Sequence, residues 1–288
     1  MPFSSLASPS ATIDVLVRHG LYTRKRLGQH FLVDDNVVGR ILGLACLSGT
    51  EHVLEVGPGI GTLTYALAQA ARSVVAVERD DRLKAALDEL IAACPNVTVV
   101  YEDALHVTPD DLRADDGSLP CTMVANLPYS VAATVVLRFF ERLPGLRSAT
   151  VMVQAEVADR MAADPGTKQY GAYTVKLALR ARCVDRFAVP RTCFLPPPRV
   201  DSAVVRLERI EARPDADVAR ASAAADAAFS QRRKTIRNAI ASAAGAAAGE
   251  VEHALRAAGL DPSARAEDLG VEDFVVLGRV LAGYGILP

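Results

Sequence analysis

Between residues 52 and 154 the chain alternates short apolar runs with segments of helical periodicity, and this alternation limits the possible folds more than any other feature. The apolar runs cover residues 52–56, 73–78, 97–101, 121–126 and 149–154. Between the second and third runs, Leu83, Ala86, Leu87 and Leu90 recur at helical spacing. Strands that are apolar on both faces and separated by helices are typical of a parallel sheet between two helical layers. We therefore predict an α/β fold.

The C-terminal half follows a different pattern. Segments 173–184 and 201–210 are predicted strands without a long helix between them, which indicates an antiparallel edge of the sheet. The polar, proline-containing segment 212–219 is a predicted linker, and alanine-rich helical segments follow it. We predict a nucleotide-binding α/β domain over residues 1–210 and a small helical domain over residues 211–288. Residues 1–10, rich in Ser, Pro and Ala, are predicted to be disordered.

Composition narrows the class of protein. A net charge of -2 argues against a protein that coats nucleic acid uniformly, although local basic patches remain compatible with it. The five cysteines form no CxxC pair, which favours free thiols in a reducing compartment and no metal site. No signal-peptide pattern opens the sequence, and no apolar run approaches the roughly 18 residues that a membrane span needs. We expect a cytoplasmic protein without a membrane span.

A glycine-rich turn follows the first apolar run. Gly57, Gly59 and Gly61 stand where a strand is expected to pass into a helix. Such glycines let the backbone approach a ligand closely, with helix N–H groups facing it. Turns of this kind serve NAD, FAD and S-adenosylmethionine alike, and a tight turn without a ligand is the alternative interpretation. Thr62 stands where the dehydrogenase spacing GxGxxG requires its last glycine, which favours S-adenosylmethionine over NAD. We predict that Gly57 and Gly59 contact this cofactor.

Two carboxylates follow the next two runs. Glu78 ends the second run, 21 residues after Gly57, where an acidic side chain can accept two hydrogen bonds from ribose hydroxyls. Asp103 follows the third run and is placed to contact an adenine amino group. The alternatives are a surface carboxylate in the charged turn 79–82 for Glu78 and a helix N-cap for Asp103.

The segment Asn126-Leu127-Pro128-Tyr129 follows the fourth run. This residue pattern suits the methylation of an exocyclic amine of a purine. Such an amine is a poor nucleophile because its lone pair is delocalised into the ring, so the enzyme must hold the NH2 group with acceptors that favour a pyramidal nitrogen. The side-chain oxygen of Asn126 and the carbonyl of Leu127 are two such acceptors. Pro128 restricts the loop, and Tyr129 offers a face on which a flipped base can stack. We predict these four residues as catalytic; the alternative is a proline turn capped by Asn126 with Tyr129 packed on the core.

Two basic clusters are candidate RNA contacts. Four basic residues in six positions lie on a predicted helix whose apolar face carries Phe229, Ile236 and Ile240, and phosphate contact is the functional interpretation. These four are Arg232, Arg233, Lys234 and Arg237. The second cluster, Arg24, Lys25 and Arg26, precedes the segment 28–32. A solvated helix face and a charged entry to the domain are the respective alternatives.

With Asn-Leu-Pro-Tyr in place, the chain resembles the ribosomal RNA adenine N6,N6-dimethyltransferase family, the small-subunit enzymes whose loss gives kasugamycin resistance. The resemblance extends from Thr23 to about Phe274. It includes segments 24–32, 54–64, 77–80, 102–105, 126–131, 170–175, 194–207 and 229–240. It implies a Rossmann-like class I methyltransferase domain, with a mostly parallel seven-stranded sheet, and a small C-terminal helical domain that binds RNA.

The resemblance also implies a cofactor site and a substrate. S-adenosylmethionine would be bound by His30, Leu32, Gly57, Glu78, Asp103 and Asn126. The family often has Asn at position 30, and imidazole can likewise donate or accept one hydrogen bond. The implied substrate is a pair of adjacent adenines in the 3′-terminal hairpin loop of small-subunit rRNA, each methylated twice. The implied partner is the 30S subunit or its precursor, and the enzyme is expected to be a monomer.

Three other functions stay open at this point. The macrolide-resistance methylases share the catalytic loop but act on large-subunit rRNA, whereas segments 194–200 and 231–238 favour the small-subunit branch. A DNA adenine methyltransferase would more often carry proline at position 127 and a separate target-recognition region. A ribosome-assembly factor that kept the fold without catalysis is the third, and the intact loop 126–129 speaks against it.

Overall fold

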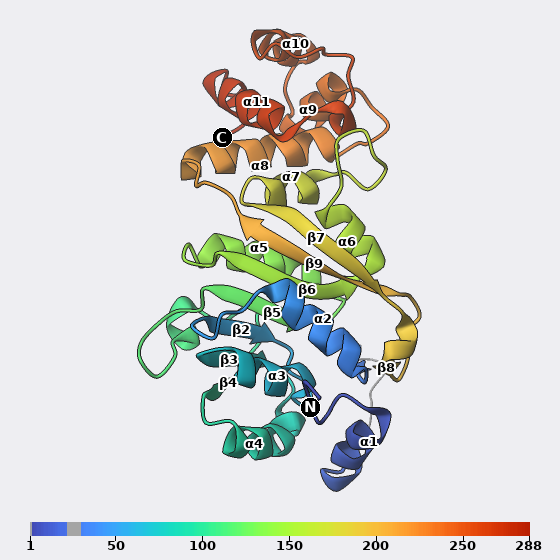
Figure 1. Ribbon diagram of the computed structural model, residues 1–288. Helices are drawn as coiled ribbons and strands as arrows, with labels where there is room; N and C mark the ends of the chain where they lie inside the picture. The colour runs from blue at the N-terminus through green and yellow to red at the C-terminus, as the bar shows by residue number, and fades with distance from the viewer. Residues whose placement is uncertain (1, 22–29) are drawn as a thin grey trace. The chain divides into compact units, whose positions relative to one another are not determined.

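The computed structural model describes residues 2–21 and 30–288 (Figure 1). Its internal contacts divide the chain into two compact units. The first unit comprises Met1–Ala158 and Cys183–Arg209, and the second comprises Asp159–Arg182 and Ile210–Pro288. The chain passes from the first unit into the second at Ile210, close to the predicted boundary. Segment 159–182, which the prediction gave to the α/β domain, groups with the C-terminal helices.

A seven-stranded sheet forms the centre of the first unit, with the order β4-β3-β2-β5-β6-β9-β7. The strands are β2 (His52–Val56), β3 (Ser73–Glu78), β4 (Val97–Tyr101), β5 (Thr122–Asn126), β6 (Ser148–Gln154), β7 (Ala181–Val189) and β9 (Ser202–Arg209). The five strands from β4 to β6 pair in parallel, and β9 pairs antiparallel with β6. The predicted mostly parallel sheet with an antiparallel edge is confirmed.

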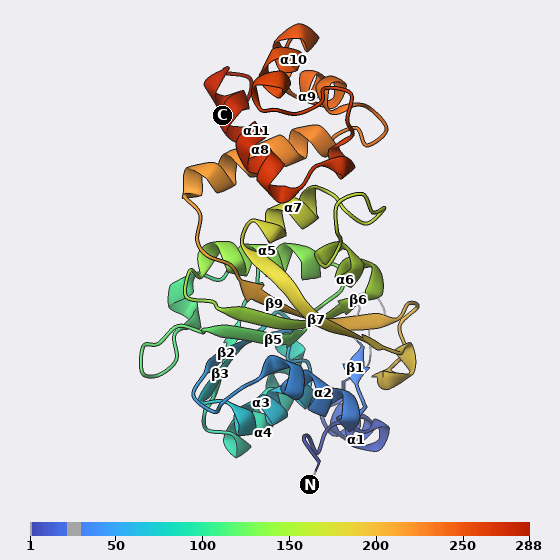
Figure 2. The ribbon, with the colours of Figure 1, turned by 45° about the horizontal axis from the view of Figure 1, so that its top comes forward.

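Helices on both faces explain why the central strands are apolar throughout. The helices are α2 (Asp35–Ala45), α3 (Thr62–Ala70), α4 (Lys84–Ala93), α5 (Ala132–Arg142) and α6 (Ala155–Met161). A buried cluster joins the sheet to α2, α3 and α4, and it contains Ile41, Leu67 and Leu87. Figure 2 shows α5 on the opposite face of the sheet from α2 and α3. A strand buried on both faces does not alternate apolar and polar residues, so these strands are continuous valine-rich runs.

The predicted disorder of residues 1–10 is wrong for residues 2–10. The backbone N–H groups of Phe3 and Ser4 donate to the Asp35 carboxylate at 3.1 and 2.8 Å, and Ala7 is buried. Helix α1 (Pro9–Arg18) begins after Ser8, whose side chain accepts from the N–H of Ala11. Serine followed by proline is a helix-start signal. The prediction of disorder relied on composition alone and missed this helix-start signal.

The segment 173–184 is not a single strand. Its first part forms α7 (Ala172–Ala178), and β7 begins only at Ala181. The run contains β-branched and aromatic residues, which favours a strand by propensity. Thr174, Val175 and Leu177 are nevertheless buried in the helix, so tertiary packing overrides that preference.

The second unit is helical, as predicted for the C-terminal region. Besides α7 it contains α8 (Asp215–Phe229), α9 (Ile236–Ala244), α10 (Ala248–Ala257) and α11 (Val271–Gly283). Helix α8 begins inside the predicted linker. A Cβ on Gly278 of α11 would lie 2.6 Å from the backbone of Arg220 on α8. The glycine and the buried alanines of α8, including Ala221 and Ala224, therefore permit close helix packing.

Strand direction positions the candidate site. Because β2, β3, β4 and β5 are neighbouring parallel strands, their carboxyl ends lie on one edge of the sheet. The glycine turn and all the predicted residues from Glu78 to Tyr129 follow these ends. In open α/β sheets, ligands bind at this edge. Among the described residues, no helix combines the length and the apolar character needed to cross a membrane.

Candidate active site

The turn between β2 and α3 lies against the loop after β5. Gly57 has φ 74°, and a Cβ on it would lie 3.2 Å from Cδ of Pro128. Gly59 has φ 61°, and a Cβ there would lie 3.3 Å from the ring of Phe31. Both positions combine left-handed backbone with close approach, which only glycine accommodates well. The structure thus brings the predicted cofactor turn and the predicted catalytic loop together.

Glu78 is buried at the end of β3 and is hydrogen-bonded to the glycine turn. One carboxylate oxygen accepts from the N–H of Gly59 at 3.3 Å, and the other accepts from the N–H of Asp80 at 2.8 Å. Burial raises the pKa of Glu78, and the hydrogen bonds from the backbone of Asp80 and Gly59 oppose that rise. A carboxylate has about four acceptor positions, so two remain for other donors. This geometry does not match the alternative of a surface carboxylate.

Asp103 lies just beyond β4, at the same edge of the sheet. Its Oδ1 accepts from the N–H of Leu105 at 2.9 Å, as a turn-capping residue does. Its Oδ2 lies 3.2 Å from the guanidinium of Arg79, whose side chain is largely exposed. The N–H of Glu102 donates to the carbonyl of Glu78 and joins the ends of the two strands. Asp103 is therefore both a local cap and a neighbour of Glu78.

The predicted catalytic loop begins at the end of β5. Asn126 is the last residue of that strand and pairs with Met152 on β6. The next N–H, from Leu127, donates to the carbonyl of Met152 at 3.0 Å, and the Leu127 side chain is buried. In the described part of the chain the side-chain amide of Asn126 makes no hydrogen bond. The amide is thus held in place by its backbone while its oxygen stays available to accept.

Tyr129 is held by a residue distant in sequence. Its hydroxyl is hydrogen-bonded to that of Ser202 at 2.7 Å, and its ring stacks with that of His30 at a centroid distance of 5.8 Å. Burial raises the pKa of the Tyr129 phenol, and the bond to Ser202 opposes the rise. Nδ1 of His30 donates to the carbonyl of Pro196 at 2.7 Å. The alternative of a tyrosine packed wholly into the core does not apply, because Tyr129 keeps part of its surface exposed.

His30 and Leu32 stand on either side of Phe31, whose ring approaches Gly59. Leu32 belongs to the short strand β1 (Phe31–Leu32), which pairs with β8 (Phe194–Leu195). Its side chain is buried in the core of the first unit. His30 contacts Tyr129 through its ring and therefore adjoins the predicted catalytic loop.

Two buried residues were not singled out by the sequence analysis. Ser202, the first residue of β9, is fully buried. Glu55, within β2, is also buried, and its Oε2 has no hydrogen-bond partner among the described residues. Burial, with a contribution from the negative charge of Glu78, raises the pKa of Glu55 to about 8. The available signal was a carboxylate in the middle of an apolar strand run, because such a residue is seldom buried without a reason.

A model of the protein family described as ribosomal RNA adenine dimethylase matches residues 20–282. The chain belongs to the ribosomal RNA adenine dimethylase family. It is 46% identical over 277 residues to the ribosomal RNA small subunit methyltransferase A of Kineococcus radiotolerans, covering 94% of this chain and 90% of that protein. The corresponding protein of Thermobifida fusca is 45% identical, covering 93% and 94%. Membership in this family makes the chain a methyltransferase, as predicted.

Solved structures of an rRNA methyltransferase and of a dimethyladenosine transferase share the fold. The 23S rRNA methyltransferase ErmE matches with a TM-score of 0.65 and 30% identity, covering 88% of this chain and 99% of that one. A dimethyladenosine transferase from Plasmodium falciparum matches with a TM-score of 0.73 over 90% of this chain and 99% of that one. At 22% identity the second likeness supports the fold alone. The predicted Rossmann-like methyltransferase fold is confirmed.

The C-terminal basic cluster does not lie on one helix as predicted. Helix α8 ends at Phe229 and α9 begins at Ile236, so Arg232, Arg233 and Lys234 lie in the turn between them. Thr235 is extended and precedes α9, which interrupts the expected helical period. With Gln231, the three basic residues line a cavity of about 580 Å³. The three basic residues therefore lie on a loop and not on a helix; residues 231–234 are called the basic turn below.

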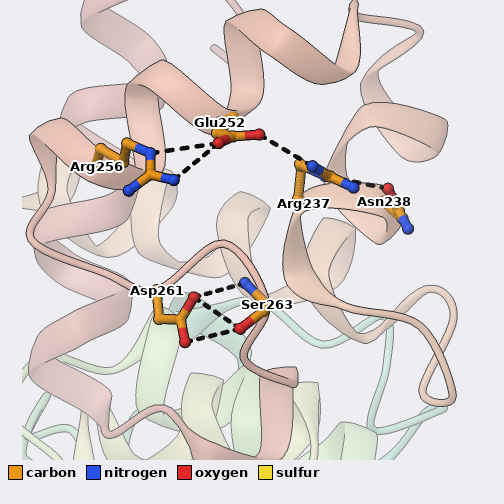
Figure 3. Close-up of polar contacts among 6 residues, drawn as sticks. All are labelled: Arg237, Asn238, Glu252, Arg256, Asp261 and Ser263. Carbon is orange, nitrogen blue, oxygen red and sulfur yellow. Dashed lines mark hydrogen bonds and ion pairs between the residues drawn. The ribbon is translucent and has the colours of Figure 1, made fainter.

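The four basic residues also differ in their contacts. The guanidinium of Arg232 donates to the carbonyls of Lys168 and Tyr170 at 2.9 and 2.8 Å. Arg237 pairs with Glu252 at 2.9 Å, and Figure 3 shows the Glu252 carboxylate between Arg237 and Arg256. These two arginines lower the pKa of Glu252 through their hydrogen bonds.

Arg233 and Lys234 are exposed, and within residues 2–21 and 30–288 their side chains make no ion pair. Of the four residues in this cluster, these two therefore have charges that no described residue pairs with. The second predicted cluster, Arg24, Lys25 and Arg26, lies outside the described residues.

Proposed function

We propose that this enzyme uses S-adenosylmethionine to dimethylate N6 of two adjacent adenines in the 3′-terminal hairpin loop of 16S rRNA. The observation that carries the proposal is the position of Asn126. Its side-chain amide, which has no hydrogen-bond partner among the described residues, lies at the carboxyl end of β5, on a loop that contacts the glycine turn. The Asn126–Tyr129 segment is thereby joined to a nucleotide-type pocket. The reaction is proposed to occur in the cytoplasm, with the enzyme as a monomer and the 30S subunit or its precursor as substrate.

The residues around the glycine turn fit S-adenosylmethionine. Glu78 offers two carboxylate oxygens whose remaining acceptor positions suit a ribose, and positive-φ glycines keep the approach to the turn open. Asp103 at the neighbouring strand end suits an adenine amino group, with its contact to Arg79 on the solvent side. When bound, the cofactor supplies a methyl group on a positively charged sulfur. We assign His30, Leu32, Gly57, Gly59, Glu78, Asp103 and Asn126 to this site.

The catalytic loop is proposed to act on the amine through acceptors alone. The Asn126 oxygen and the Leu127 carbonyl accept from the two N–H groups of the adenine, which favours a pyramidal nitrogen and directs its lone pair towards the methyl group. Pro128 maintains the loop next to Gly57. The ring of Tyr129 binds the base by stacking. No general base is required, because the proton leaves after the amine has become positively charged.

RNA binding is proposed for the basic turn and for the cluster at residues 24–26. Within the turn, Arg233 and Lys234 are the best-supported phosphate contacts, because neither forms an ion pair with another described residue. Arg232 would contribute mainly by fixing the turn, since its guanidinium is bonded to two carbonyls. Arg237 would contribute a charge shared with Glu252.

The small-subunit substrate is favoured over the large-subunit one. The relatives that are 42–46% identical over more than nine-tenths of the chain are named small-subunit enzymes, whereas the 23S rRNA enzyme ErmE is 30% identical. The complete Asn126–Tyr129 loop argues against an assembly factor without catalysis.

The test is transfer of labelled methyl groups to 30S particles that lack the modification, with 50S particles and naked DNA assayed alongside. We expect four methyl groups per 30S particle and none on the other two. Transfer to 50S particles instead would replace the proposed substrate, and no transfer to any of the three would contradict an enzymatic role.

A further inference from the structure

The hydroxyl of Tyr129 has a partner that stacking on a base does not require. It lies 2.7 Å from Oγ of Ser202, which is 73 residues further along the chain. Ser202 is fully buried. A buried hydroxyl needs a hydrogen-bond partner, and among the described residues Tyr129 is the partner of this side chain. The two hydroxyls therefore depend on each other.

Ser202 is fixed by the sheet. It is the first residue of β9 and pairs with Gln154, and the antiparallel ladder continues without interruption to Ser148 and Glu208. The carbonyl of the preceding Asp201 accepts from the N–H of Ala155. Ser202, whose backbone is paired at the first position of this ladder, therefore has little freedom to move. Its hydroxyl is thus a fixed point near the end of β5.

His30 restrains the tyrosine ring from a second direction. The two rings stack with an interplanar angle of 26°, and Nδ1 of His30 is bonded to the carbonyl of Pro196. Rotation of the Tyr129 side chain would break both the contact with His30 and the bond to Ser202. The ring orientation is therefore set within the first unit before any base arrives.

We propose that Ser202 is a positioning residue for methyl transfer. By holding the Tyr129 phenol, it fixes the plane on which the target adenine stacks, and so the angle at which the N6 lone pair meets the methyl group. This inference rests on the proposed function, because it assumes that the base stacks on Tyr129. Pre-oriented groups accelerate reactions by avoiding the loss of freedom at the moment of reaction, and small misalignments are costly.

Tyr129→Phe separates stacking from positioning. Stacking needs the ring and not the hydroxyl, so stacking alone predicts that the phenylalanine variant is as active as the original enzyme. Positioning by Ser202 predicts that Tyr129→Phe and Ser202→Ala lose a similar part of the rate. It also predicts that the double variant is no slower than either single variant, because the same hydrogen bond is already absent.

The experiment measures single-turnover methylation of unmodified 30S particles at saturating enzyme and cofactor by wild type, Ser202→Ala, Tyr129→Phe and the double variant. We expect each variant to be slower by about 10-fold, between the loss of one neutral hydrogen bond and the roughly 100-fold cost of a misplaced reactant. Cofactor affinity, measured by calorimetry, should stay unchanged, which a general distortion of the sheet would not allow.

Multiplicative losses in the double variant, or a Tyr129→Phe enzyme as fast as wild type, would overturn the inference. Tyr129→Phe removes the same hydrogen bond by changing its partly exposed partner. The rate of Tyr129→Phe therefore tests the positioning role of Ser202 even if Ser202→Ala does not fold. Failure of the proposed function has a different signature, since wild type itself would then not methylate 30S particles. That result would remove both proposals.

Discussion

The carboxyl edge of the sheet and the basic turn of the helical unit use their polar residues in opposite ways. At the sheet edge, Glu78 is buried, and its place follows from the strand that carries it. In the basic turn, Arg232 and Arg233 are adjacent in sequence, yet Arg232 is bonded to two carbonyls, whereas Arg233 makes no ion pair within the part of the chain that the structure describes. A buried site is thus defined by strand order, whereas an exposed basic cluster must be examined one side chain at a time.

The largest expected effect lies at the sheet edge. Asn126→Ala should lower the single-turnover methylation rate by about 100-fold or more, if the lost acceptor resembles one oxyanion-type contact. Both adenines and both methyl additions should slow, because one pocket serves all four transfers. Rapid-quench methylation of 30S particles measures this, with Asn238→Ala as a control on an exposed asparagine of α9. A loss of less than tenfold would mean that the loop does not act on the amine.

The second effect concerns the cofactor. Glu78→Ala should weaken S-adenosylmethionine binding by about 1.5–3 kcal/mol, the range for hydrogen bonds to a charged group. Asp81→Asn, an exposed carboxylate three residues later, is the matched control and should bind normally. Isothermal titration calorimetry on the folded variants provides the comparison. Equal affinities for the two variants would remove Glu78 from the site.

The third effect is a pH dependence of cofactor binding. Burial raises the pKa of Glu78, and the negative charge of Asp80 acts in the same direction. Ribose hydroxyls donate to the ionised carboxylate, so binding favours deprotonation. Affinity should then be complete above the raised pKa and should fall by up to about tenfold per pH unit below it. Glu78→Gln should abolish this slope; a slope that persists would assign it to another group, of which buried Glu55 is the nearest candidate.

The smallest effects divide the basic turn. Arg233→Ala with Lys234→Ala should weaken RNA binding and reduce the salt slope by about 1–2, because each phosphate contact contributes about 0.7–0.9. Arg232→Ala should mainly reduce stability, by about 1 kcal/mol, since its guanidinium is partly exposed. Filter binding over a salt series and thermal unfolding separate the two outcomes. If Arg232→Ala changes the salt slope as much as the double variant, the distinction within the turn is wrong.

Strand positions could be predicted closely from the sequence. The runs at 52–56, 73–78 and 97–101 coincide with β2, β3 and β4, because strands buried on both faces are continuous apolar runs with clear ends. Helix α7 was missed because its composition favours a strand while packing against α8 decides otherwise. The basic turn was assigned to a helix because the spacing of Phe229, Ile236 and Ile240 fits one, although the chain turns between α8 and α9.

The sequence by itself determined the order of strands and helices from β2 to β6, the glycine turn and the Asn126–Tyr129 loop, because each depends on residues close together in the chain. Only the tertiary structure decided that Ser202 meets Tyr129, since β9 must first insert beside β6. Only the tertiary structure placed Arg232 on the carbonyls of segment 159–182. Contacts between distant segments arise from the strand order and helix packing of the whole unit, which local periodicity does not encode.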